Sequence, residues 1–248
     1  MSNDAHSLNI LGVVGARSGS KSIPHKNIKP LLGKPLMAWI IQAAKRSSYI
    51  TRLILSTDSP EYAAIGRQYG AETPFLRPAE LATDTASDMD YLRHAVSWLE
   101  ENENWKADII LRLPATSPLC STESVNACIE HLLRDPETTS ARTITSSPKH
   151  PYKLWQIREE DNTLHPFIAK ETVGFPEPSG MARQFYKPAA YTHVDVIAVR
   201  YDTLMKDGLL TGEKTRYHLI DKRDAVDIDS EIDFLVAEIL LKKRLGIT

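Results

Sequence analysis

A loop rich in glycine, serine and positive charge is the first segment whose residues could do chemistry. It reads Gly15-Ala16-Arg17-Ser18-Gly19-Ser20-Lys21 and follows the apolar run 10–14. Glycine lets backbone amides approach an anion closely, and the two cations would neutralise its charge, so the loop suits a triphosphate. It matches neither the Gly-x4-Gly-Lys-Ser/Thr loop nor the Gly-x-Gly-x-x-Gly turn. On this motif alone, phosphate binding and a solvated surface loop both stay open.

A pair of carboxylates near the C-terminus is the second candidate. Asp227 and Asp229 are two residues apart in a segment that we expect to be extended. Their side chains can therefore lie on one face and share a hard cation through oxygen ligands. The alternative is a helix cap, because Asp229 or Ser230 precedes the last expected helix and Asp233 lies three residues beyond Ser230.

Alternating strands and helices are expected to position these residues. Apolar runs predict strands at 10–14, 53–55, 73–76 and 108–113, and helices at about 35–46, from 60 onward, at about 85–101 and at about 122–133. This order implies parallel pairing and an α/β fold, a three-layer α/β/α sandwich. Ligands in such sheets bind beyond the carboxyl ends of the strands, which points to the loops starting at Gly15, Asp58, Arg77 and Pro114.

Residues 140–200 show a different pattern. Short β-like runs at 143–145, 154–157 and 194–199 accompany a Pro/Gly-rich stretch from 171 to 188. A chain of 248 residues can form one large domain, and we interpret 140–188 as a small β-rich excursion from it. The chain is expected to close with a strand at 225–229 and a helix at about 230–244.

Composition and charge exclude several classes of partner. A net charge of −2 lacks the basic excess that nucleic-acid binding usually needs, so no nucleic acid is expected. Cys120 and Cys128, without further Cys or His in metal spacing, indicate neither a disulfide framework nor a zinc site. The sequence shows no signal peptide and no apolar run near the ~20 residues of a membrane span. We therefore expect a cytoplasmic protein without a membrane partner.

The run from Ala16 to Asn27 resembles the signature of the acylneuraminate cytidylyltransferase family. Further matches follow in the family's order at 55–58, 77–87, 116–119 and 226–229. The resemblance implies a Rossmann-like nucleotidyltransferase fold, with 140–188 as a dimerisation arm of a homodimer. It also implies an enzyme that joins CMP from CTP to an acidic 2-keto-3-deoxy sugar of the sialic acid type and releases pyrophosphate, with Mg²⁺ as cofactor.

The same resemblance assigns roles to individual residues. Arg17 and Lys21 would bind the triphosphate and stabilise the transition state, as positioned cations do in phosphoryl transfer. Asp227 and Asp229 would hold Mg²⁺, and Asp229 would assist proton removal through the metal or a bound water. The remaining residues expected to bind substrate are Ala16, Ser20, Lys26, Asn27, Arg77, Asp84, Thr85, Ser87, Thr116, Ser117, Lys153 and Arg183. For Asp84 and Thr85, a helix cap is an open alternative.

Three departures from the family pattern concern the side of the site that would hold the sugar. Pro114 stands where relatives have a Gln, Val194-Asp195 replaces an Asn-Gly pair, and Leu209-Leu210 falls near a partner-subunit aromatic pair. We therefore expect a sugar preference shifted away from N-acetylneuraminate. Alternatives are a nucleotidyltransferase for a legionaminic, pseudaminic or octulosonic-type acid, a metal-dependent glycosyltransferase, and a catalytically silent sugar-nucleotide binding protein.

Overall fold

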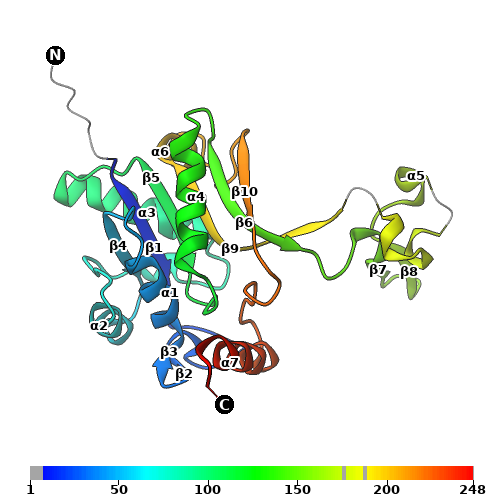
Figure 1. Ribbon diagram of the computed structural model, residues 1–248, viewed down its shortest axis with the longest axis horizontal. Helices are drawn as coiled ribbons and strands as arrows, with labels where there is room; N and C mark the ends of the chain where they lie inside the picture. The colour runs from blue at the N-terminus through cyan, green and yellow to red at the C-terminus, as the bar shows by residue number, and fades with distance from the viewer. Residues whose placement is uncertain (1–7, 175–176, 187–188, 248) are drawn as a thin grey trace. The chain divides into compact units, whose positions relative to one another are not determined.

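A computed structural model describes residues 8–174, 177–186 and 189–247 (Figure 1). The chain divides into two compact units, and each is described here by itself. The first unit comprises residues 1–143 and 194–248, and the second comprises residues 144–193. No helix in the described ranges is long and apolar enough to cross a membrane.

A six-stranded mixed sheet forms the centre of the first unit, in the order β10-β6-β9-β5-β1-β4. Both β4 and β5 pair with β1 in parallel, as the sequence predicts, whereas β9 runs antiparallel to β5. The strands are β1 (Ile10–Gly15), β4 (Arg52–Ser56), β5 (Ile109–Pro114), β6 (Ser140–Ser146), β9 (Tyr191–Arg200) and β10 (Thr215–Leu219).

Helices cover both faces of this sheet and make the expected three layers (Figure 1). Alternate strand residues point to opposite faces, so that Val14 and Leu55 pack towards α1, α2 and α4, while Val13 and Ile54 pack towards α3 and α6. The helices are α1 (Leu36–Lys45), α2 (Pro60–Gln68), α3 (Asp88–Glu103), α4 (Thr122–Arg134) and α6 (Tyr201–Met205).

A third core cluster holds the C-terminal helix α7 (Glu231–Leu245) against the segments that follow β1. Phe234 and Leu241 of α7 pack with Ile23, Leu31 and Ile228. Short elements lie in these segments: η1 (Lys26–Ile28), β2 (Pro30–Leu31), β3 (Lys34–Pro35) and, later in the chain, η2 (Ala79–Leu81). This packing fixes the segment that carries Asp227 and Asp229.

The second unit is built around an antiparallel hairpin of β7 (Trp155–Arg158) and β8 (Thr163–Pro166). Its short helices are η3 (Pro151–Lys153), α5 (Lys170–Val173), η4 (Pro178–Gly180) and η5 (Arg183–Phe185). Of the three expected β-like runs, 154–157 overlaps β7 of this unit. The runs 143–145 and 194–199 lie in β6 and β9 of the central sheet. The single-domain organisation and a dimerisation role for 140–188 stay predictions.

Two expected strands are wrong. Residues 73–76 form no strand; the chain makes only an isolated parallel bridge between Glu72 and Ile54. Pro74 lacks the amide hydrogen that a ladder needs. Residues 225–229 also form no strand, and Ile228 N–H instead donates to Thr116 O at 3.0 Å.

Candidate active site

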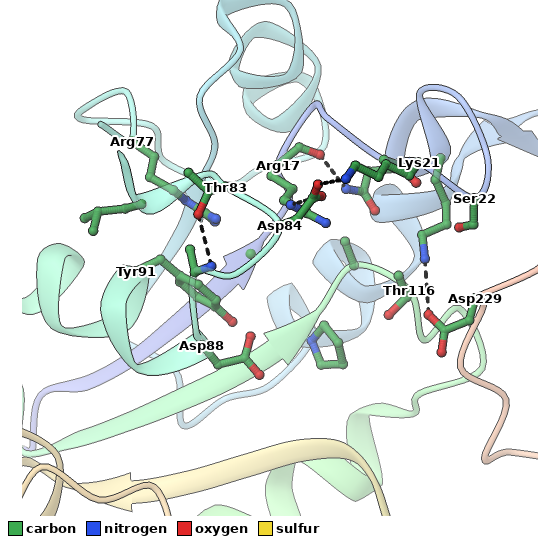
Figure 2. Close-up of a pocket in the computed structure, with 18 of the residues that line it drawn as sticks. Arg17, Lys21, Ser22, Arg77, Thr83, Asp84, Asp88, Tyr91, Thr116 and Asp229 are labelled. Atoms are coloured by element: carbon green, nitrogen blue, oxygen red, sulfur yellow. Dashed lines mark hydrogen bonds and ion pairs between the residues drawn. The ribbon is translucent and has the colours of Figure 1, made fainter. Parts of the chain in front are cut away.

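A cavity of about 520 Å³ opens at the carboxyl ends of β1 and β5, where parallel sheets bind ligands (Figure 2). Its lining combines five cations with three carboxylates, a balance that suits an anionic ligand. The predicted site residues that it brings together are Arg17, Ser20, Lys21, Lys26, Asn27, Arg77, Asp84, Thr116 and Asp229.

The loop after β1 is held in place by hydrogen bonds from neighbouring segments. Asp58 accepts from Ser18 N–H at 2.8 Å and from Ser18 Oγ at 2.6 Å. Asn27 Nδ2 donates to Arg17 O at 3.0 Å, and the buried Ala16 donates its N–H to Ser56 O at 3.0 Å. Because its backbone is fixed at these points, the loop presents Arg17 to the cavity in a set position.

Asp84 lies between the two cations of this loop (Figure 2). Arg17 Nη1 is 2.7 Å from Asp84 Oδ1, and Lys21 Nζ makes an ion pair with Asp84 Oδ2. The hydrogen bond from Lys21, followed by that from Arg17, lowers the pKa of Asp84 below its ordinary value. The predicted phosphate-binding cations are thus brought together, and a carboxylate of this chain pairs with both.

Arg77 is a buried residue whose guanidinium is already bonded within the chain. Its Nη2 donates to Ser56 O at 2.6 Å and its Nε to Ser56 Oγ at 3.0 Å, while its Cζ lies 4.5 Å from the centre of the Tyr91 ring. Burial lowers the pKa of Arg77 and raises that of Tyr91. These contacts make Arg77 and Tyr91 a rigid wall of the cavity.

Lys26 connects the loop to the C-terminal carboxylates. Its buried ammonium donates to Ile228 O at 2.5 Å and lies 3.5 Å from Asp229 Oδ1. Asp227 and Asp229 are exposed on either side of the fully buried Ile228. Asp229 lines the cavity together with Lys26.

Serines cap helices α3 and α7, which decides whether Asp84, Thr85 or Asp229 is a helix cap. Ser87 caps α3 in a capping box with Asp90, and Ser230 caps α7 in a capping box with Asp233. Asp84, Thr85 and Asp229 are therefore not the capping side chains. The described cavity lining includes neither Thr85 nor Ser87.

The donor atoms of Asp227 and Asp229 decide whether the pair fits a magnesium ion. No group of three or more His, Cys, Asp or Glu side chains in the described ranges could hold a metal. Mg²⁺ commonly takes only one or two protein carboxylates and completes its shell with water and substrate phosphates. Two exposed carboxylates beside a cation-lined cavity fit that donor set.

A buried aspartate on β9 was not predicted as a site residue. Asp195 is 2% exposed, and neither of its carboxylate oxygens has a hydrogen bond of normal geometry within the described chain. Ser117 Oγ is buried without such a bond as well. Burial raises the pKa of Asp195 to about 6, while the neighbouring Ser117 hydroxyl acts in the opposite direction. The signal in the sequence that could have identified Asp195 is its charge within an otherwise apolar run.

Arg112 is a second residue that the sequence reasoning missed. It lies on β5, lines the cavity, and places its Nε 2.8 Å from Asp88 Oδ2, while its Nη1 donates to Asp195 O at 3.1 Å. It lies two residues before Pro114, at which the sequence predicted a departure on the sugar side of the site. An arginine in an otherwise apolar strand could have drawn attention to this position.

Two predicted residues belong to the second unit. Lys153 ends η3 and places its ammonium 5.5 Å from the centre of the Tyr186 ring. Arg183 begins η5, and its side chain lies outside the described part of the structure. Their contact with substrate stays a prediction.

Known proteins share both the sequence pattern and the fold. The sequence profile of the cytidylyltransferase family matches residues 11–165 of this chain. The chain belongs to this family. It is therefore an enzyme, and its resemblance to the acylneuraminate cytidylyltransferases is confirmed.

Two relatives and one solved structure illustrate the similarity. N-acylneuraminate cytidylyltransferase of Escherichia coli is 29% identical over 95% of this chain and 52% of its own length. CMP-N,N'-diacetyllegionaminic acid synthase of Legionella pneumophila is 28% identical over 95% of this chain and 97% of its own length. The structure of a CMP:2-keto-3-deoxy-manno-octonic acid synthetase complexed with CTP has a TM-score of 0.69 at 16% identity, covering 95% of this chain and 99% of that one. This last likeness confirms the α/β fold.

Proposed function

We propose that this cytidylyltransferase couples CTP to an acidic 2-keto-3-deoxy sugar and releases pyrophosphate and a CMP-sugar. The observation that carries the proposal is the convergence of Arg17 and Lys21, from the loop after β1, on one anionic group in a cavity of the central sheet. Relatives named for sialic and legionaminic acids support a sugar acid as the acceptor.

The proposed reaction is an in-line attack of the anomeric C2 hydroxyl on the α-phosphorus of CTP, with pyrophosphate as leaving group. Arg17 and Lys21 bind the triphosphate and stabilise the charge that moves to the leaving group. Lys26 and Ser20, which line the same cavity, would hold the triphosphate in line with the acceptor. Asp227 and Asp229 would hold Mg²⁺, which supplies charge neutralisation when bound.

The family resemblance implies that this chain departs from N-acylneuraminate enzymes on the sugar side of the site, at Pro114 and Val194-Asp195. Arg112 lines the same cavity as Pro114, and its Nη1 donates to the backbone O of the buried Asp195. We propose a preference for an acid other than N-acetylneuraminate, of the legionaminic, pseudaminic or octulosonic type. The proposal also includes a homodimer that works in the cytoplasm.

A panel assay tests this function. CTP, UTP, GTP and ATP are each combined with N-acetylneuraminic, legionaminic, pseudaminic and octulosonic acids in Mg²⁺, and pyrophosphate release is measured. We expect release with CTP and a sugar acid other than N-acetylneuraminic acid. Best turnover with another nucleotide would contradict the choice of base, and best turnover with N-acetylneuraminic acid would show that Pro114 and Asp195 do not set the sugar preference.

A further inference from the structure

The two loop cations are neutralised by a carboxylate from a distant part of the chain. Asp84 follows η2 and contacts Arg17 Nη1 at 2.7 Å through Oδ1 and Lys21 through Oδ2 (Figure 2). Each of the two carboxylate oxygens thus takes one of the two cations. A single phosphate group would meet the same pair of cations in the same way, with two of its oxygens.

The side chain of Asp84 does not stabilise the turn or the helix cap of its own loop. Thr83 Oγ1 accepts from Ala86 N–H at 3.1 Å and forms the turn, and Ser87 with Asp90 caps the following helix. In the described part of the chain, the side-chain contacts of Asp84 are those with Arg17 and Lys21. The side chain is 38% exposed, so it can leave these cations without opening the core.

Asp84 and a bound phosphate cannot share these cations without repulsion. If Asp84 stays in place, its charge lies beside the incoming anion, and like charges in contact weaken binding strongly. If Asp84 leaves, the anion must replace two ion pairs. In either case the carboxylate weakens binding of every anion that uses these two cations.

We propose that Asp84 is a placeholder anion, which pairs with Arg17 and Lys21 until a phosphate group binds and displaces it. This inference rests on the proposed function and refines it at one residue. It differs from the direct nucleotide contact that the family resemblance implies for Asp84, because a placeholder opposes binding whereas a contact promotes it.

The two roles predict opposite effects of Asp84→Asn, which removes the charge and keeps the size. Binding of inorganic pyrophosphate to the full chain is measured by isothermal titration calorimetry. We expect the dissociation constant to fall by about tenfold, because one like charge is removed from the site. Inorganic phosphate should gain affinity by a similar factor, because displacing Asp84 breaks the same two ion pairs whichever anion binds.

Asp88→Asn is the matched control. Asp88 lines the same cavity but pairs with Arg112 at 2.8 Å instead of with the loop cations. Its removal should change pyrophosphate affinity by less than about twofold if the effect at Asp84 depends on contact with Arg17 and Lys21 and not on net charge. Cytidine, which has no phosphate, should bind the wild type and Asp84→Asn equally.

Weaker or unchanged pyrophosphate binding in Asp84→Asn would overturn the inference, as would an equal gain in Asp88→Asn. Asp84→Ala removes the carboxylate without adding the amide of asparagine, and it should give the same gain in pyrophosphate affinity. Failure to do so would count against a charge effect. The outcome is separable from the proposed function. Tighter pyrophosphate binding in Asp84→Asn, without CTP-dependent turnover by the wild type, would support the placeholder and contradict the proposed reaction. Turnover by the wild type, without tighter pyrophosphate binding in Asp84→Asn, would support the reaction and contradict the placeholder.

Discussion

Arg17 and Lys21 differ in how firmly the chain holds them. Arg17 follows a buried alanine, and its carbonyl accepts from Asn27, whereas the Lys21 side chain is 82% exposed. A guanidinium also offers two donors in a fixed plane, while an ammonium is a mobile point charge. Arg17 can therefore orient a phosphate, and Lys21 mainly neutralises it.

Replacing either cation should slow the chemical step. We expect Arg17→Ala and Lys21→Ala each to lower kcat at least ~100-fold, the scale seen when a positioned transition-state donor is removed. Steady-state kinetics with CTP and the preferred sugar acid measures this. Lys222→Ala, at an exposed lysine on a turn, is the control and should leave kcat unchanged. A change confined to KM for the sugar would contradict a role at the triphosphate.

Asp195 should make stability depend on pH. Its folded pKa of about 6 lies above the ordinary 3.8 because burial disfavours the charge. The folded state therefore binds the proton more tightly, and stability falls as pH rises from about 4 through about 6. Asn carries no charge, so Asp195→Asn should be more stable than the wild type by about 3 kcal/mol at pH 8 and by little at pH 4.

Urea unfolding at both pH values measures this difference. Asp207→Asn, at an exposed aspartate, is the control and should show no such dependence. A wild type that is more stable than Asp195→Asn at pH 8 would mean that an unseen favourable partner compensates the buried charge.

At the scale of elements, the sequence predicted those helices and strands whose pattern is local. Helices α1 and α4 begin and end within two residues of the expected bounds, because an apolar face and Pro or Ser at the start are visible in the sequence. The strand at 73–76 failed because Pro74 interrupts any ladder. The membership of β6 and β9 in the central sheet depends on pairing between segments far apart in the chain, which periodicity does not encode.

The residues of the candidate site likewise divide into those that a local sequence pattern predicts and those that only the fold brings together. The loop with Arg17 and Lys21 was predicted because its residues are consecutive and carry a recognisable composition. Arg112 and Asp195 were missed because each is a single charge within an apolar strand, where local pattern predicts only core. The ion pairs of Asp84 join residues more than sixty positions apart and needed the fold itself.

Ser87 shows how an element can explain a residue that the resemblance assigns to the site. Its hydroxyl accepts from Asp90 N–H, and Asp90 accepts from Ser87 N–H at 2.8 Å, so the residue begins α3. Ser87→Ala should lower the free energy of unfolding by about 1 kcal/mol, and Ser87→Thr should restore most of it. Chemical denaturation measures both variants. A loss of CTP affinity at full stability would instead support the expected substrate contact.

At the scale of the whole molecule, the second unit exposes several large apolar side chains on and beside its hairpin. Ile157 and Leu164 are directly paired across the β7–β8 hairpin and are 70% and 61% exposed. Trp155 and Phe167 are exposed as well. Apolar groups gathered in this way mark interaction surfaces in soluble proteins, which supports the proposed homodimer.

A charge on this hairpin should break the proposed dimer. We expect Ile157→Asp to shift the protein from dimer to monomer in sedimentation equilibrium, because burying a carboxylate against apolar groups is unfavourable. Gln156→Asp adds the same charge one residue earlier on the same hairpin, where side chains point to the opposite face, and should stay dimeric. A wild type that sediments as a monomer would contradict the homodimer, and equal dissociation in both variants would exclude this face as the contact.

The buried Ile228 gives the segment that carries Asp227 and Asp229 a built-in hydrogen-exchange reporter. Its amide hydrogen is bonded to Thr116 O at 3.0 Å, and its side chain is fully buried between the two exposed aspartates. This hydrogen can exchange with solvent only when the segment separates from the loop after β5. Deuterium uptake at Ile228 should therefore slow when Mg²⁺ binds to Asp227 and Asp229 and CTP fills the cavity, and hydrogen-exchange mass spectrometry would record occupancy of the site without any turnover.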